Sequence, residues 1–277
     1  MPAFVLLILT NIGPLLVLLV LSFTNYELGA VDVESVGLQN FRDALADTTM
    51  RTSLGNTFLY VAIVVPASVM LSLFVAILVY RRTRSRGFYE VIYFLPVTTT
   101  LIAMASMWQF LLHPQLGPIN TFLDAIGLGR TAFLSNPSTV IPTLAAIGVW
   151  QLLGFNMVLF LAGLSAIPKD VYEAADIDGA THPLDRFLKI TWPLLGPTTM
   201  FVTVTTFITA FKIFDTVAVL TRGGPMKASE TVLYSIYLEG FQYFHISYSA
   251  TLTLIFLLFT LIFSGAQMIF MDRRVHY

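Results

Sequence analysis

Six long apolar stretches constrain this chain more than any other feature of its sequence. Each reaches the roughly 20 apolar residues that an α-helix needs to cross the hydrocarbon core of a membrane. None alternates at a period of two residues, which argues against the strands of a membrane barrel. The sequence therefore predicts six membrane-spanning helices, at about residues 3–23, 54–80, 88–112, 139–163, 195–220 and 248–271.

The composition excludes most soluble functions. Hydrophobic residues make up 56% of the 277 residues and charged residues 11%, whereas an ordinary soluble domain is about one quarter charged. The net charge of −1 provides no basic surface for nucleic acid. The lack of cysteine excludes a disulfide scaffold and a thiolate zinc site, and the four histidines have no metal-ligand spacing. We expect a single all-α integral membrane domain without a metal site.

The first stretch could be mistaken for a signal peptide. The residues before it, Met1-Pro2-Ala3, carry no positive side chain, and its apolar run is too long for the core of a signal sequence. We expect it to be a membrane helix.

The distribution of Lys and Arg predicts the orientation, because these residues are enriched in cytoplasmic segments. If the N-terminus is cytoplasmic, nine basic residues lie inside, five lie outside, and Lys212 falls within the fifth stretch. The inside set is Arg81, Arg82, Arg84, Arg86, Lys169, Arg186, Lys189, Arg273 and Arg274, and the outside set is Arg42, Arg51, Arg130, Arg222 and Lys227. Both termini are therefore expected in the cytoplasm.

The segment between the fourth and fifth stretches, residues 164–194, has the signals of two short helices. Pro168 suits the start of a helix, and acidic residues follow it in the first turns. Gly179 can adopt the left-handed conformation that ends a helix, and Pro183 disfavours helix before it. A second short helix is expected over about residues 184–190.

This segment could dock on a protein or lie on lipid headgroups. Alanines at the centre of a helix permit close approach by another protein, whereas an amphipathic helix can lie at the membrane surface. Anionic lipid would repel the segment, because five acidic residues outnumber three basic ones. The acidic residues are Asp170, Glu173, Asp176, Asp178 and Asp185. We favour docking on a protein partner.

The same segment resembles a known family. Glu173-Ala174-Ala175, Asp178-Gly179-Ala180, Ile190 and Pro193 are similar to the EAA motif of bacterial ABC importer permeases. Residues 37–41 resemble a short motif of carbohydrate permeases, and residues 214–215 with 220–225 resemble the signature after span 5 of the maltose-type group, in particular the first of its two permease subunits. Trp192 departs from the pattern, which usually has leucine before the proline.

The resemblance implies the type I permease fold of ABC importers, with a coupling helix between spans 4 and 5. It also implies import of a sugar or oligosaccharide across the bacterial inner (cytoplasmic) membrane. The partners would be a second permease, an ATPase dimer that binds ATP and Mg²⁺, and an extracytoplasmic solute-binding protein, while this chain would bind no cofactor. Coupling to the ATPase would fall on Glu173, Ala174, Ala175, Asp178 and Gly179.

The sequence motifs also predict that this chain is not an enzyme. No G-x-x-x-x-G-K-[ST] segment is present, so a phosphate-cradling loop has to come from another polypeptide. No H-E-x-x-H segment and no recognisable Ser-His-Asp motif occurs either.

Polar residues within the spans are candidates for the solute pathway. Lys212 and Asp215 are three residues apart in the fifth stretch, so they would share a helix face. They could line the pathway, contact the binding protein or form a bracing ion pair. Trp150, Gln151 and Asn156 in the fourth stretch offer aromatic faces and amides to a sugar. Packing against lipid or another helix is the alternative for Trp150.

Two other functions stay open. The first is an importer for glycerol phosphate or a polyol, although a phosphate ligand favours an Arg-rich pathway and the spans contain no arginine. The second is a stand-alone secondary transporter, which predicts inverted repeats, broken helices or a buried acidic residue at mid-membrane. No acidic residue lies near the centre of spans 1, 2, 4 or 6.

Overall fold

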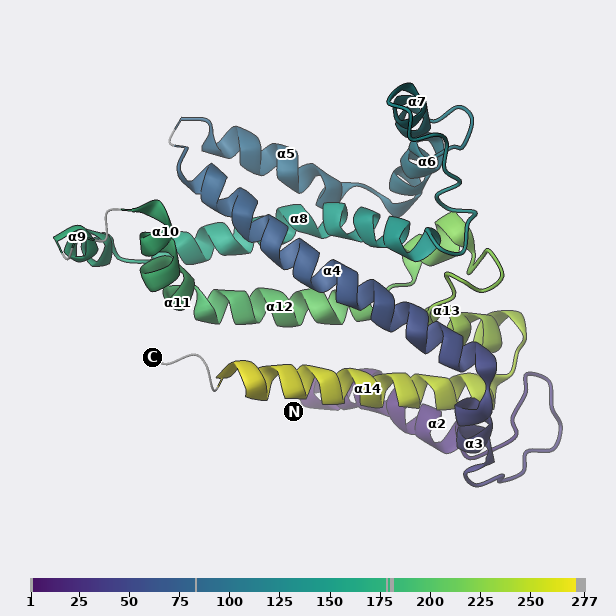
Figure 1. The fold of residues 1–277 in the computed structure, drawn as a ribbon. Coiled ribbons are helices and arrows are strands. Elements are labelled where there is room, and N and C mark those ends of the chain that lie inside the picture. Colours follow the sequence, from purple (N-terminus) through teal and green to yellow (C-terminus); the bar gives the residue numbers. More distant parts are fainter. Residues whose placement is uncertain (1, 83, 178, 180–181, 273–277) are drawn as a thin grey trace. The chain divides into compact units, whose positions relative to one another are not determined.

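The computed structural model describes residues 2–82, 84–177, 179 and 182–272. These residues form helices and connecting loops, and the β-structure among them is one isolated bridge between Thr24 and Ser35. The helices in Figure 1 are α1 (Pro2–Leu7), α2 (Gly13–Leu21), α3 (Gln39–Ala46), α4 (Thr48–Tyr80), α5 (Arg86–Thr98), α6 (Leu101–Leu111), α7 (Pro118–Ala125), α8 (Val140–Ala166), α9 (Lys169–Ile177), α10 (Pro183–Arg186), α11 (Trp192–Leu194), α12 (Gly196–Phe211), α13 (Val232–Tyr237) and α14 (Ile246–Asp272). The described residues also form π-helical segments at Ile8–Ile12, Phe187–Thr191, Val217–Thr221 and Leu238–Gln242.

The predicted all-α class is confirmed, but the count of six spans stays a prediction. Three described helices, within α4, α8 and α14, are long and apolar enough to cross a membrane alone. Two bent pairs would raise this number to five, and Val5–Leu21 is a shorter apolar helix.

The third predicted span is broken rather than straight. Its two halves, α5 and α6, meet at an angle of 97°. Pro96 lacks a backbone N–H, and the hydroxyls of Thr98 and Thr99 donate to the Leu95 carbonyl at 2.9 and 3.0 Å. These contacts compete with continued helix at the break.

The fifth predicted span is also wrong as a single helix over 195–220. α12 ends at Phe211, and a separate π-helical turn follows at Val217–Thr221. Lys212 and Asp215 therefore do not share an uninterrupted helix, and both side chains are exposed. A continued helix would have carried both charges at apolar depth, where ionisable groups are costly.

The chain divides into two compact units. Unit 1 contains Met1–Leu59, Leu112–Ile141 and Lys212–Ile262, and unit 2 contains Tyr60–Leu111, Pro142–Phe211 and Phe263–Tyr277.

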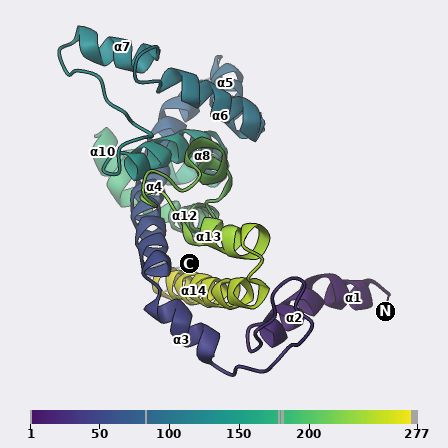
Figure 2. The ribbon, with the colours of Figure 1, turned by 90° about the vertical axis from the view of Figure 1, so that its right-hand side faces the viewer.

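The core of unit 2 joins three helices that lie side by side in Figures 1 and 2. It is formed by Val69, Leu73, Ala76 and Val79 of α4, by Leu153, Met157, Phe160 and Leu164 of α8, and by Leu195 and Val202 at and within α12. α5 packs closely on α8, because a Cβ at Gly154 would overlap the backbone carbonyl of Tyr93. Only glycine permits this approach.

Unit 1 has its own core, where α13 lies beside α14 (Figure 2). Val232 and Ile236 of α13 pack with Leu252 of α14, together with Ala44 and Met50. Asn40 lies at the start of α3. Its amide donates to the carbonyls of Ser22 and Thr24 at 2.9 and 2.8 Å, which fixes α3 to the end of α2.

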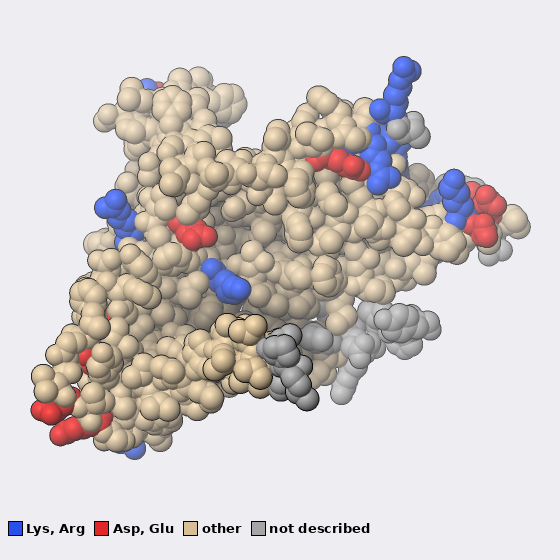
Figure 3. All heavy atoms as spheres, turned by 180° about the vertical axis from the view of Figure 1, so that it is seen from behind, with Lys and Arg blue, Asp and Glu red and all other residues tan. Residues whose placement is uncertain are grey.

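The surface is more apolar than that of a water-soluble protein. Large hydrophobic side chains are exposed along α2, α4, α5 and α14, for example Val20 at 64%, Met70 at 71%, Val91 at 63% and Leu261 at 62%. Tan spheres cover most of the face in Figure 3, and charged residues are few there. Exposed apolar surface of this extent is typical of a chain surrounded by lipid.

Candidate functional site

The predicted pair of short helices between α8 and α12 is present. α9 runs from Lys169 to Ile177, directly after Pro168, and α10 with its π-helical extension covers residues 183–191. Gly179 has a φ of +85°, which is the left-handed conformation expected after the end of a helix. The second helix meets α12 at an angle of 68°.

Polar contacts tie α9 to the second helix. The hydroxyls of Tyr172 and Thr191 lie 3.0 Å apart, and Nη1 of Arg186 lies 3.2 Å from Oδ1 of Asp176. The Arg186 guanidinium also stacks 5.3 Å from the centre of the Tyr172 ring. Tyr172 and Phe187 both pack against the unit 2 core, so this loop is attached to the membrane helices of its own unit.

The residues with the EAA resemblance divide between the two faces of α9. Ala175 is buried against the chain itself, with 8% of its surface exposed. Glu173 and Ala174 are exposed on the opposite face, and Ile177 next to them is 87% exposed. Asp178 lies outside the described residues. The outward face of α9 therefore exposes an apolar side chain, Ile177, together with the Glu173 carboxylate.

The acidic character of this face is not compensated locally. Asp170 and Glu173 form no ion pair within the described part of the chain, whereas Asp176 and Asp185 are paired with Arg186 and Lys189. The outward face of α9 therefore presents free carboxylates.

Asn156 occupies a closed position between three helices. Its side chain is 1% exposed, and its amide nitrogen lies 2.9 Å from both Ser68 Oγ of α4 and Thr206 Oγ1 of α12. In this conformation the amide joins helices and does not face an open space.

Trp150 and Gln151 are partly buried on α8. The Trp150 ring lies 5.4 Å from that of Trp108 on α6 in an edge-to-face arrangement. Nε1 of Trp108 is buried and has no hydrogen-bond partner within the described residues.

Lys212 and Asp215 do not form the bracing ion pair that their spacing suggested, as judged over the described residues. Both lie in unit 1, in the segment between α12 and the π-helical turn. They remain exposed charged groups.

Sequence reasoning missed Ser68, Thr191 and Arg186 as partners of the candidate residues. Each pairs with a residue 10 to 88 positions away. No local sequence pattern predicts partners at such distances along the chain, because the tertiary packing brings them together. No group of three or more His, Asp or Glu that could hold a metal ion occurs among the described residues.

The segment after α12 leads through the π-helical turn at Val217–Thr221 to the short helix α13, which lies in unit 1. Ser235 on α13 donates to the buried carboxylate of Glu230 at 2.7 Å and lies 2.7 Å from Ser53 of α4. Burial raises the pKa of Tyr234, and the Glu230 carboxylate raises it further.

Comparison with known proteins places this arrangement in a family. Residues 68–276 match the sequence pattern of the binding-protein-dependent transport system inner membrane component. A sn-glycerol-3-phosphate transport system permease protein, UgpA, of Agrobacterium fabrum is 34% identical over 87% of this chain and 82% of its own length. UgpA of Yersinia enterocolitica is 35% identical over 88% and 82% of the two chains. A probable ABC transporter permease protein of Pyrococcus horikoshii is 32% identical over 87% and 83%.

A solved structure shares the fold. A chain of a bacterial ABC transporter involved in the import of the acidic polysaccharide alginate superposes with a TM-score of 0.86 at 20% identity, over 99% of this chain and 93% of that one.

These matches decide between the function classes. The family comprises membrane permease components, and the ATPase of such a transporter is a separate subunit, so the prediction that this chain is not an enzyme is confirmed. The alternative of a stand-alone secondary transporter is set aside for the same reason. The chain belongs to the family of inner membrane components of binding-protein-dependent transport systems, and it is the permease subunit of an ABC importer.

Proposed function

We propose that the chain forms half of the translocation pathway of an ATP-driven importer for a sugar or oligosaccharide. The supporting observation is that α8, which carries Trp150, Gln151 and Asn156, and α12, which packs against it, contain no Asp, Glu, Lys or Arg. Trp150 and Gln151 offer an aromatic face and an amide, which suit a neutral, hydroxylated solute. We keep Trp150 and Gln151 as proposed pathway residues, whereas Asn156, the third candidate, is enclosed by its contacts with Ser68 and Thr206, and we propose that it joins helices instead.

A second candidate solute is glycerol 3-phosphate or a related polyol phosphate. The relatives named for glycerol-3-phosphate transport, at 34–35% identity, favour it. Lys212 is exposed and without an ion pair among the described residues, so it is available to a phosphate group. A dianionic phosphate is usually held by several basic groups, and the partner permease would have to supply the others.

Reconstitution separates these two solutes. The transporter is assembled in proteoliposomes with its solute-binding protein, and ATP hydrolysis is measured against a panel of sugars, polyols and glycerol 3-phosphate. A neutral sugar is expected to stimulate hydrolysis. Stimulation by glycerol 3-phosphate alone would replace the sugar assignment, and loss of that stimulation in Lys212→Gln would support the phosphate contact.

We further propose that the outward face of α9 docks on the ATPase. Glu173, Ala174 and Ile177 would form the contact, Ala175 would hold α9 to its own chain, and Gly179 would set the exit angle of the helix; Asp178 is proposed from the sequence resemblance alone. The exposure of Ile177 and the ties from Tyr172 and Asp176 to the second helix support this assignment.

Glu173→Ala tests the docking face. Transport is expected to fall at least about tenfold, equivalent to about 1.4 kcal/mol of lost interaction, while insertion and the amount of protein in the membrane stay unchanged. Glu34→Ala, an exposed carboxylate in unit 1, is the matched control and should transport normally. Normal transport by Glu173→Ala would overturn the coupling assignment.

The importer is further proposed to contain a second permease, two copies of the ATPase with ATP and Mg²⁺, and an extracytoplasmic solute-binding protein. We place it in the bacterial inner membrane with both termini in the cytoplasm, because nine basic residues against five favour that orientation. Affinity purification from the native host should recover a second permease and an ATPase. Topology reporters that place the Arg81–Arg86 turn outside would reverse the proposed orientation.

A further inference from the structure

The turn between α4 and α5 carries four arginines within six residues. Arg86 is already paired within the chain. Its Nε lies 2.7 Å from Oε1 of Glu90, and its Cζ lies 5.8 Å from the centre of the Tyr80 ring. Arg81, Arg82 and Arg84 are exposed. Within the described part of the chain, none of these three forms an ion pair. Three uncompensated positive charges therefore stand at this turn.

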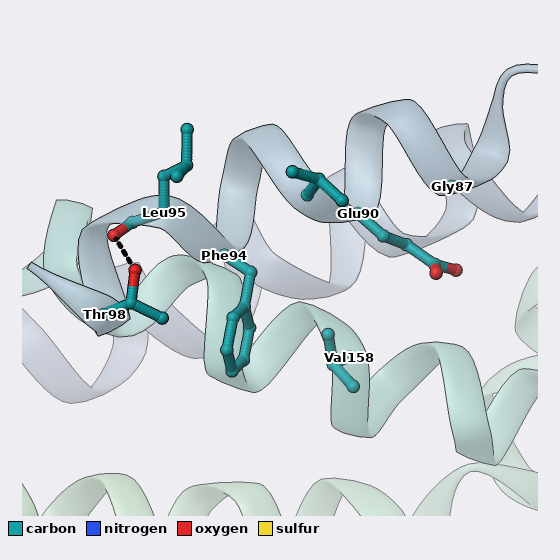
Figure 4. Close-up of a pocket in the computed structure, with 7 residues that line it drawn as sticks. Gly87, Glu90, Phe94, Leu95, Thr98 and Val158 are labelled. Atoms are coloured by element: carbon teal, nitrogen blue, oxygen red, sulfur yellow. Dashed lines mark hydrogen bonds between the residues drawn. The ribbon is translucent and has the colours of Figure 1, made fainter.

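A hollow of about 440 Å³ begins at Gly87, the residue after Arg86. Gly87 and Glu90 lie at the end next to the turn, and the rest of the lining is almost entirely apolar. It is formed by Val91, Phe94, Leu95, Thr98 and Val158. Figure 4 shows Phe94 pointing toward the helix that carries Val158. The Thr98 hydroxyl is satisfied by the Leu95 carbonyl at 2.9 Å.

Neither polar side chain of the lining, Glu90 or Thr98, would repel an anion bound at the mouth of the hollow. The Glu90 carboxylate is neutralised by Arg86, which leaves an excess of three positive charges over the turn. From Gly87 to Leu95 the lining runs for about 12 Å along α5, at ~1.5 Å per residue. A cationic mouth and an apolar length of this kind match a molecule with an anionic head and a hydrocarbon tail.

We propose that this groove binds an anionic phospholipid, with one acyl chain between α5 and α8 and its phosphate held by Arg81, Arg82 and Arg84. The exposure of Val91 at 63% and Leu95 at 56% on a membrane helix makes the groove accessible to lipid. Clustered basic residues next to a membrane span attract anionic headgroups. The lipid site is independent of the transported solute, and a helix of the second permease is the competing occupant.

The chain contains no cysteine, so a single introduced thiol reports on the groove. Val91→Cys is labelled with a bimane fluorophore in the assembled transporter, on a partner background without cysteine. The complex is placed in bilayer discs of phosphatidylcholine with a minor fraction of phosphatidylglycerol. Either lipid is brominated on its acyl chains so that it quenches a neighbouring fluorophore.

Brominated phosphatidylglycerol is expected to quench this label several-fold more strongly, per molecule, than brominated phosphatidylcholine. In R81Q/R82Q/R84Q the preference should disappear, because each arginine near a membrane surface contributes about fivefold to binding an anionic lipid, or about 1 kcal/mol. Val20→Cys, at a site of 64% exposure, is the matched control and should be quenched equally by both lipids. Equal quenching at Val91, or protection of the label by the second permease, would overturn the proposal.

A variant that keeps every charge tests the apolar half independently. Leu95→Trp fills the groove, and native mass spectrometry of the intact transporter counts the phosphatidylglycerol it retains. Retention is expected to fall at least threefold relative to Leu258→Trp, which changes a leucine of similar exposure, 58%, on α14. Unchanged retention in Leu95→Trp would place bound lipid elsewhere and would also overturn the proposal.

Discussion

Substitution of Asn156 tests whether a polar residue within the membrane helices packs them together or contacts the solute. The Asn156 amide nitrogen lies 2.9 Å from hydroxyl oxygens on two other helices, and its side chain is 1% exposed. We therefore expect Asn156→Leu to weaken the association of α4, α8 and α12 without changing the affinity for solute.

The size of the effect follows from the two lost contacts. Hydrogen bonds between membrane helices contribute about 0.6 kcal/mol on average and at most about 1.7. Two such bonds give about 1 kcal/mol, with an upper bound near 3. The freed hydroxyls of Ser68 and Thr206 can bond to carbonyls of their own helices, which keeps the loss near the lower value. Asn156→Asp should cost more, about 3 kcal/mol, because it places an ionisable group near a helix centre.

Unfolding of the purified transporter in mixed micelles measures these differences, and uptake in proteoliposomes measures the KM for solute. Asn156→Asp should be less stable than Asn156→Leu, and both should keep the wild-type KM. A double-mutant cycle with Thr206→Val should give a coupling energy of about 0.6 kcal/mol. Ser165→Ala on the same helix removes a hydroxyl that donates to the Leu161 carbonyl of its own helix, and it serves as the control.

Two outcomes would refute this reasoning. The first is a large change in KM with unchanged stability, which would make Asn156 a solute ligand. The second is a coupling energy near zero between Asn156 and Thr206, which would mean that the contact does not hold the helices together.

Two glycine substitutions give further tests. Gly179→Ala should strain a residue at φ +85° by about 1–2 kcal/mol and lower the ratio of solute transported to ATP hydrolysed, and an unchanged ratio would contradict a fixed exit angle for α9. Gly154→Ala should lower the thermal midpoint of unfolding, because its Cβ would overlap the Tyr93 carbonyl at an overpacking cost of about 1–3 kcal/mol. Gly55→Ala is the control, because its Cβ would meet open space and the midpoint should stay unchanged.

The helix pattern was largely predictable from the sequence because apolar length is a local property. The fourth stretch, predicted at 139–163, corresponds to α8 at Val140–Ala166, and Gly179 ends α9 as its conformational freedom suggested. The breaks at Thr99 and Lys212 were not predicted. Hydropathy averages over about 20 residues and does not register a bend within an apolar run.

The pairing of candidate residues was less predictable. A spacing of three residues places Lys212 and Asp215 on one face only if both lie in the same helix. The helix α12 ends at Phe211, one residue before Lys212. Trp108 and Trp150 are 42 residues apart and meet only through the packing of α6 on α8. The division of Glu173-Ala174-Ala175 between two faces follows from helix geometry, but which face is buried depends on Tyr172 and its distant partner Thr191.

The two faces of α9 also bear on how such importers diversify. Substitutions at Glu173, Ala174 or Ile177 leave the contacts with the rest of this chain intact, whereas Tyr172, Ala175 and Asp176 are held by the permease's own fold. With the proposed docking on the outward face, a lineage can acquire a different ATPase, or share one among several permeases, by changing that face alone. The inward face would drift slowly, and the two sets of positions would vary independently among descendants.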